Sequence, residues 1–227
     1  MTSAPTADRA AVVRDSLGVG IATGLYGTSF GAVSVAAGLD VWQTCALSLL
    51  MFTGASQFAF VGVLAGGGTP VTGAVTALLL GTRNTLYGLR VGPLLGFGGP
   101  ARVAAAHVLI DESTAMSVNH EDRSLARTGF LTTGIAIFVL WNLFTLLGAV
   151  AGAAMGDPRA YGLDAAVGAA FLALVWPRLS ERRNQVVAVV AAALALGLVP
   201  VTAAGVPVLA AGGVALLAGV LGRGGPR

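Results

Sequence analysis

The stretch that decides the fold runs from Pro70 to Gly96 and reads PVTGAVTALLLGTRNTLYGLRVGPLLG. It is long enough for a helix to cross the roughly 30 Å apolar core of a bilayer. A Thr-Arg-Asn-Thr run, residues 82–85, lies near its middle. A guanidinium is costly at that depth, so we expect Arg83 to face a protein interior or a water-filled cavity and to have a partner.

The composition predicts an integral membrane protein. Of the 227 residues, 56% are hydrophobic and only 10% are charged. Soluble domains carry about 25% charged residues, so this chain has too few to cover a surface that faces water. Its apolar runs are long and continuous, whereas the strands of a membrane barrel alternate in blocks of about ten residues. We therefore expect an all-α, polytopic membrane fold.

The same composition argues against several kinds of site. The chain has one Cys and two His, which are too few for a disulfide framework or a metal cluster, so we expect no metal and no cofactor. The net charge is only +3, and no basic patch with interleaved aromatic residues indicates nucleic acid binding. The polar N-terminus lacks the pattern of a cleaved signal peptide, so we expect the first span to be retained.

Apolar runs separated by Gly- and Pro-rich turns predict about seven membrane-spanning helices within a single transmembrane domain, residues 1–227. A polar connecting loop is expected over residues 100–127. The last three runs are short for a bilayer core, so a fold with fewer crossings and re-entrant segments stays open. The expected spans are residues 17–37, 41–65, 70–96, 129–154, 163–176, 186–199 and 208–221.

Two similar segments point to an internal repeat. Gly-Ala-Val followed by Gly-Leu-Asp occurs from Gly31 to Asp40 and again from Gly148 to Asp164, with a spacing that differs by seven residues. Chance competes with this interpretation in a chain so rich in Gly and Ala. Under the repeat hypothesis, residues 16–99 pair with residues 128–200. Three spans in each repeat would make the repeats inverted, a transporter plan with its site at discontinuous helices near the midplane.

Small polar residues in the second expected span mark a candidate site. Thr-Gly-Ala-Ser-Gln, residues 53–57, is a place where a helix can loosen. Freed backbone groups at membrane depth occur only where they line a cavity or are buried in protein. For Gln57, an interhelical hydrogen bond of about 1 kcal/mol and a substrate contact are equally good interpretations. Gly54 and Ser56 join Gln57 as candidates for substrate binding.

The acidic pair Asp111 and Glu112 also has two interpretations. It could begin an ordinary interfacial helix, since Asp is a good N-cap, or it could begin a half-helix that presents carboxylates to the membrane interior. In the second case Arg83 could be neutralised by one of them as a structural clamp, or could contact substrate directly together with Asn84. Asp111 and Glu112 are therefore candidates for charge coupling or for pairing with Arg83. Asp164, at the start of the expected span 163–176, is a third candidate.

Catalysis is the weaker alternative. Gly54-Ala55-Ser56 superficially resembles the Gly-x-Ser of an intramembrane serine protease, but such a Ser needs a nearby base. Both His residues lie in the expected polar loop, and the chain has no HExxH motif. We therefore expect no enzyme. One cation, several carboxylates and several amides would suit a zwitterionic amino acid, so the residues themselves indicate a transporter or channel for a small polar or amphipathic solute.

Several segments together resemble the AzlC family of branched-chain amino acid permeases. The resemblance covers nearly the whole chain, in the order and length expected of the family. Its segments are FG at 30–31 with GL at 38–39, FTGASQF at 52–58, RNTLY at 83–87, LIDE at 109–112, and LDAA at 163–166 with FLAL at 171–174.

The resemblance implies a multi-pass protein of the bacterial cytoplasmic (inner) membrane that exports leucine, isoleucine and valine, with methionine or analogues. It also implies a small hydrophobic AzlD-type partner subunit, and energy from the proton motive force or the membrane potential. Besides the partner, we expect contact only with amino-acid substrate and membrane lipid. We expect Gln57 and nearby backbone to bind substrate, Arg83 to hold its carboxylate, and Asp111 or Glu112 to couple charge. A passive channel for a small anion and a non-transporting membrane scaffold are the alternatives.

Overall fold

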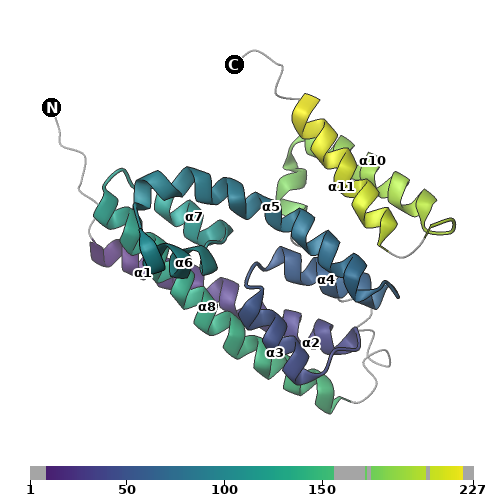
Figure 1. Cartoon of the computed structure of the whole chain (residues 1–227), viewed down its shortest axis with the longest axis horizontal. Helices are drawn as coiled ribbons and strands as arrows, with labels where there is room; N and C mark the ends of the chain where they lie inside the picture. Colours follow the sequence, from purple (N-terminus) through teal and green to yellow (C-terminus); the bar gives the residue numbers. More distant parts are fainter. Residues whose placement is uncertain (1–8, 156–171, 173–174, 203–204, 222–227) are drawn as a thin grey trace.

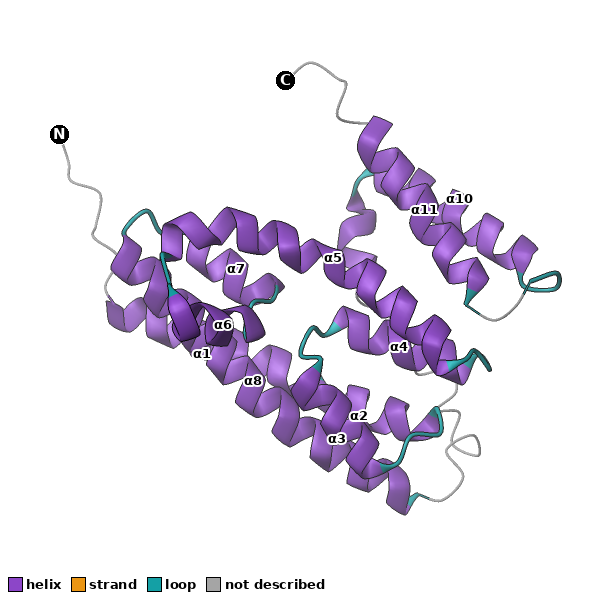
Figure 2. Cartoon of the chain, viewed as in Figure 1, coloured by secondary structure: helices purple, strands orange, loops and turns teal. Residues whose placement is uncertain are grey.

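The computed structural model describes residues 9–155, 172, 175–202 and 205–221, and throughout this part of the chain the regular structure is helical, with no strand (Figure 2). This confirms the all-α prediction. By length and composition, Arg9–Ala36 and Arg123–Ala154 could each cross a membrane, and Val41–Leu50, Ala55–Ala65 and Val206–Gly219 are shorter apolar helices. The expected number of about seven crossings stays a prediction.

Helices α1 (Arg9–Leu25) and α2 (Gly27–Ala36) lie along the long helix α8 (Arg123–Ala154) (Figure 1). Their contact is made through glycines that lie on one helix face, namely Gly20, Gly24, Gly27 and Gly31. A Cβ at Gly20 would lie 2.7 Å from the Ala136 Cβ, and one at Gly31 would overlap the backbone of α8. Small residues let helices approach this closely in lipid, so these glycines set the distance between α1–α2 and α8.

The second expected span is broken in its middle. Helix α3 (Val41–Leu50) begins at Asp40, whose side chain accepts a hydrogen bond from the Gln43 backbone N–H at 2.8 Å. Helix α4 (Ala55–Ala65) follows after residues 51–54. Gly54 adopts φ +64° there, a left-handed conformation that favours glycine. The predicted loosening of the helix is thereby confirmed.

The opening stretch forms one continuous helix, α5 (Pro70–Leu95). Thr69 caps its first turn, and Pro70 occupies a first-turn position where its missing N–H is harmless. Its 26 residues give a length of roughly 39 Å at 1.5 Å per residue. Its last carbonyl, that of Leu95, accepts hydrogen bonds from Arg123 at 3.3 Å and Arg127 at 2.6 Å.

The region expected as a polar connecting loop contains two short helices instead, α6 (Gly99–His107) and α7 (Asp111–Val118). Ser113 holds the break between them: its hydroxyl accepts from the Ile110 backbone N–H at 3.0 Å and donates to the Val108 carbonyl at 2.8 Å. Helix α6 ends after nine residues, so the apolar run before Asp111 is too short to cross a membrane.

The C-terminal part contains a short turn of 3₁₀ helix, η2 (Trp176–Ser180), followed by α10 (Arg182–Leu198) and α11 (Val206–Leu221). The last two helices form a hairpin, and the residue before α11, Gly205, contacts Thr72 of α5 (Figure 1). The expected span at 163–176 falls almost entirely outside the described residues, and Asp164 lies there too.

An aromatic cluster packs α2, α4 and α8 together. Phe30, Phe58 and Trp141 are each at most 3% exposed and lie in ring contact with one another. Large apolar side chains also cover the outside of α5 and α8, as expected for surfaces that face lipid. The buried cluster forms one wall of the cavity described below.

Replacing Gly31 with alanine should destabilise the contact between α2 and α8. The new Cβ would overlap the Thr145 carbonyl oxygen and the Ala149 nitrogen, and backbone atoms can yield only if the helices separate. We expect a loss of about 2 kcal/mol, or roughly 5 °C in the unfolding temperature in detergent. Gly18→Ala is the matched control, because a Cβ there meets nothing within 4 Å; equal unfolding temperatures for both variants would contradict the close contact.

Candidate functional site

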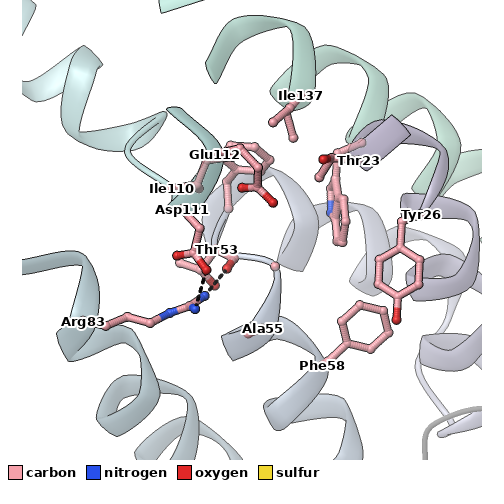
Figure 3. Close-up of a pocket in the computed structure, with 13 residues that line it drawn as sticks. Thr23, Tyr26, Thr53, Ala55, Phe58, Arg83, Ile110, Asp111, Glu112 and Ile137 are labelled. Atoms are coloured by element: carbon pink, nitrogen blue, oxygen red, sulfur yellow. Dashed lines mark hydrogen bonds and ion pairs between the residues drawn. The ribbon is translucent and has the colours of Figure 1, made fainter. Parts of the chain in front are cut away.

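The two helix breaks meet beside the middle of α5 and enclose a cavity of about 120 Å³ (Figure 3). The first break contributes Thr53, Gly54 and the start of α4, and the second contributes Ile110 and the start of α7. Arg83 reaches the cavity from α5. Segments far apart in the sequence therefore converge on one place.

Arg83 has the partner that its position requires. Its Nη1 donates to Asp111 Oδ2 at 2.7 Å, and its Nη2 donates to the Thr53 carbonyl at 3.4 Å (Figure 3). Both side chains are partly buried, with 22% and 33% of their surface exposed. This ion pair joins α5 to both breaks, because Asp111 begins α7 and Thr53 lies between α3 and α4.

Three of the predicted substrate-binding residues are not among those that line the cavity. Gln57 is fully buried; its Oε1 accepts from the Gly54 N–H at 3.1 Å, and its Nε2 donates to the Leu47 and Ser48 carbonyls. Asn84 donates to the Leu109 carbonyl at 3.3 Å. Ser56 is also buried. Gln57 and Asn84 satisfy backbone groups at the breaks, which is the hydrogen-bonding interpretation of such amides.

Gly54, Arg83, Asp111 and Glu112 are the predicted site residues that line the cavity. Glu112 stands in the first turn of α7, and it takes part in neither of the two ion pairs among the described residues. Asp164 lies outside the described residues, so its predicted role stays a prediction.

The opposite wall of the cavity is apolar and aromatic, and sequence reasoning missed it. Tyr26, Phe58 and Trp141 line it together with Ile137. The Tyr26 and Phe58 rings lie 5.4 Å apart, and the Phe58 and Trp141 rings 6.3 Å apart. The sequence indicates this wall only through Tyr26, a large side chain among small residues, which stands where α1 ends and α2 begins.

The electrostatics of the cavity combine fixed dipoles with side-chain charge. Helices α4 and α7 both begin at it, so the positive ends of two half-helices lie at its edge. The lining side chains add one guanidinium and two carboxylates. Such a cavity can bind a small solute that carries a cationic group, an anionic group and an apolar part.

The described residues offer little for other chemistry. His107 lies at 3.0 Å from the Leu49 carbonyl and is not in the cavity lining, so it supplies no base there. In the ranges that the structure describes, no group of three His, Cys, Asp or Glu side chains could hold a metal ion.

Comparison with known proteins places these features in a family. A family model described as AzlC protein matches residues 18–155, which contain every lining residue of the cavity. No curated protein and no solved structure matches the chain. Because the family match covers more than half of the 227 residues, the chain belongs to the AzlC family, a family of membrane transport proteins.

Proposed function

We propose that the chain is the large subunit of an exporter for leucine, isoleucine and valine, with methionine or analogues as further substrates, in a bacterial cytoplasmic membrane that it crosses several times. One observation carries the proposal. A single cavity between two broken helices holds carboxylates, helix N-termini and an aromatic wall. Membership of the AzlC family supports the same substrate class.

A branched-chain amino acid matches this cavity group by group. Its ammonium fits the Glu112 carboxylate, which is free of ion pairs among the described residues. Its carboxylate fits the N-terminus of α4, where backbone N–H groups carry partial positive charge. Its apolar side chain fits against Phe58 and Ile137, and burial of such a side chain contributes about 2 kcal/mol.

Arg83 acts in this proposal as a clamp. Its charge is already neutralised by Asp111 at 2.7 Å, so it holds the two breaks in position and substrate is bound beside it. The same pairing argues against a passive anion channel. Because its guanidinium is already engaged by Asp111, Arg83 has no free charge with which to select an anion.

Glu112 is the proposed coupling residue. Of the two carboxylates in the lining, Asp111 is fixed by Arg83, which leaves Glu112 to exchange a proton or to follow the membrane potential. Export driven by the proton motive force or by the potential needs one such group that changes its charge or its exposure during the cycle.

A small hydrophobic partner of the AzlD type completes the proposed exporter. The outer faces of α5 and of the α10–α11 hairpin support it, because they expose many large apolar side chains, and α10 has no buried residue. Such faces suit lipid or a second membrane protein. Transport should therefore be measured with the chain and this partner together.

Binding of amino acids to the purified chain and its partner tests the proposed function. Leucine, isoleucine and valine should each raise the unfolding temperature, because a ligand that binds only the folded state stabilises it, by about 2.7 kcal/mol at a hundredfold excess over Kd. Lysine and glutamate are the controls, since each places a second charge against the aromatic wall. If no branched-chain amino acid stabilises the protein, and labelled leucine does not leave loaded vesicles, the proposal is wrong.

Exchanging the charges of the clamp tests the role of Arg83. Arg83→Ala should abolish leucine export, since it leaves the partly buried Asp111 carboxylate without its partner and frees both breaks. The double variant Arg83→Asp with Asp111→Arg should recover part of the export, because it keeps the pair. Insertion of each variant is verified by its level in the membrane. Export by Arg83→Ala at the wild-type rate would contradict the clamp. If the swapped pair is as inactive as Arg83→Ala, Arg83 contacts the substrate directly.

Neutralising Glu112 should separate binding from coupling. We expect Glu112→Gln to lose export against a leucine gradient while it still exchanges labelled for unlabelled leucine at raised leucine concentration, because the amide oxygen still accepts from the ammonium, more weakly than the carboxylate, but the side chain cannot change charge. The matched control is Glu121→Gln, which changes an exposed carboxylate in the turn before α8. Uphill export by Glu112→Gln at the wild-type rate would remove Glu112 from the coupling.

A further inference from the structure

Trp141, a residue of the cavity wall, carries a buried hydrogen-bond donor that no described residue satisfies. The residue lies in the middle of α8, is only 3% exposed, and is part of the lining. Its indole Nε1–H has no acceptor within hydrogen-bond distance among the described residues. A buried donor without a partner costs about 1–3 kcal/mol, and native proteins pair nearly all such groups.

Packing alone does not account for a tryptophan at this position. The ring stacks on Phe30 at 6.0 Å and meets Phe58 edge to face at 6.3 Å, contacts that a phenylalanine could make without a buried N–H. Its backbone also packs closely against α2, since a Cβ at Gly27 would be 3.1 Å from the Trp141 Cα. The indole therefore belongs to a tightly packed wall of the cavity, and its buried Nε1–H has no acceptor among the described residues.

We propose that Trp141 is a substrate-binding residue whose Nε1–H donates a hydrogen bond to the carboxylate of the transported amino acid. This inference rests on the proposed function and adds a residue to it. The guanidinium of Arg83 is engaged by Asp111 and the Thr53 carbonyl, so a neutral side-chain donor supplies the specific contact. A carboxylate accepts several hydrogen bonds at once, so it can bind Trp141 and the N-terminus of α4 together.

The contact also explains how the cavity distinguishes ligands. Glu112 attracts any ammonium, so Glu112 alone would admit simple amines as well as amino acids. The Trp141 N–H strengthens the binding only of a ligand that also carries a hydrogen-bond acceptor, and it adds no charge to the cavity. Since Nε1 is enclosed by its neighbours, the carboxylate reaches it as the surrounding rings move apart on binding.

Three ligands and two variants test the inference. Leucine carries both charged groups, 4-methylpentanoate lacks the ammonium, and isoamylamine lacks the carboxylate. In Trp141→Phe, the Kd of leucine and of 4-methylpentanoate should rise about tenfold or more, as expected for a lost hydrogen bond to a charged group, while the Kd of isoamylamine stays within twofold. Trp42→Phe, at an exposed tryptophan of α3, is the matched control and should change none of the three.

Two results would overturn the inference in different ways. Equal affinities of wild type and Trp141→Phe for leucine would refute the role of Trp141 and leave the proposed function standing. If none of the branched-chain amino acids binds the wild-type protein with its partner, the proposed function fails, and the role of Trp141 fails with it. The wild-type titrations therefore distinguish the two failures.

If Trp141→Phe does not fold, a different variant that keeps Trp141 tests the same contact. The chain has three tryptophans, so the double variant Trp42→Phe with Trp176→Phe reports on Trp141 alone. We expect its fluorescence emission to shift with leucine and with 4-methylpentanoate but not with isoamylamine. Unchanged emission at a leucine concentration that raises the unfolding temperature would refute the contact.

Discussion

The ion pair between Arg83 and Asp111 is the interaction on which the site depends. A guanidinium in the middle of a helix needs a partner wherever that helix is predicted to cross a membrane, because an unpaired charge there is costly. The partner stands at the start of a half-helix, and the same guanidinium also binds the Thr53 carbonyl in the other break. One side chain of α5 thus fixes both discontinuities relative to each other, and they enclose the cavity.

The broken helices solve a problem of backbone hydrogen bonding. Interrupting a helix frees N–H and C=O groups that need partners where water is scarce. Gln57 and Ser113 satisfy several of them from within their own helices, and Asn84 and Arg83 satisfy others from α5. The first N–H groups of α4 and α7 have no partner within their own helices, and these helix starts lie beside the cavity, where they are suited to an anionic group.

The aromatic wall gives the cavity its second character. Close contact between α1–α2 and α8 depends on glycines, and it brings Tyr26 and Trp141 to within 6.2 Å of each other, centre to centre. An apolar wall opposite charged groups is the arrangement that an amphipathic amino acid requires. Under the proposed function, the charged side together with the indole N–H aligns the head of the substrate, and the apolar wall selects what the head is attached to.

The sequence by itself determined the helical class, the place of Arg83 in a long helix and the loosened helix at Gly54. Each follows from a local rule: apolar content, helix length or backbone freedom. Only the tertiary structure decided that Asp111 rather than Glu112 pairs with Arg83, that Gln57 faces the backbone rather than the cavity, and that Tyr26 and Trp141 line it. The physical reason is that local rules describe one helix at a time, whereas these contacts join α1, α4, α5, α7 and α8, and their partners are separated by long stretches of chain.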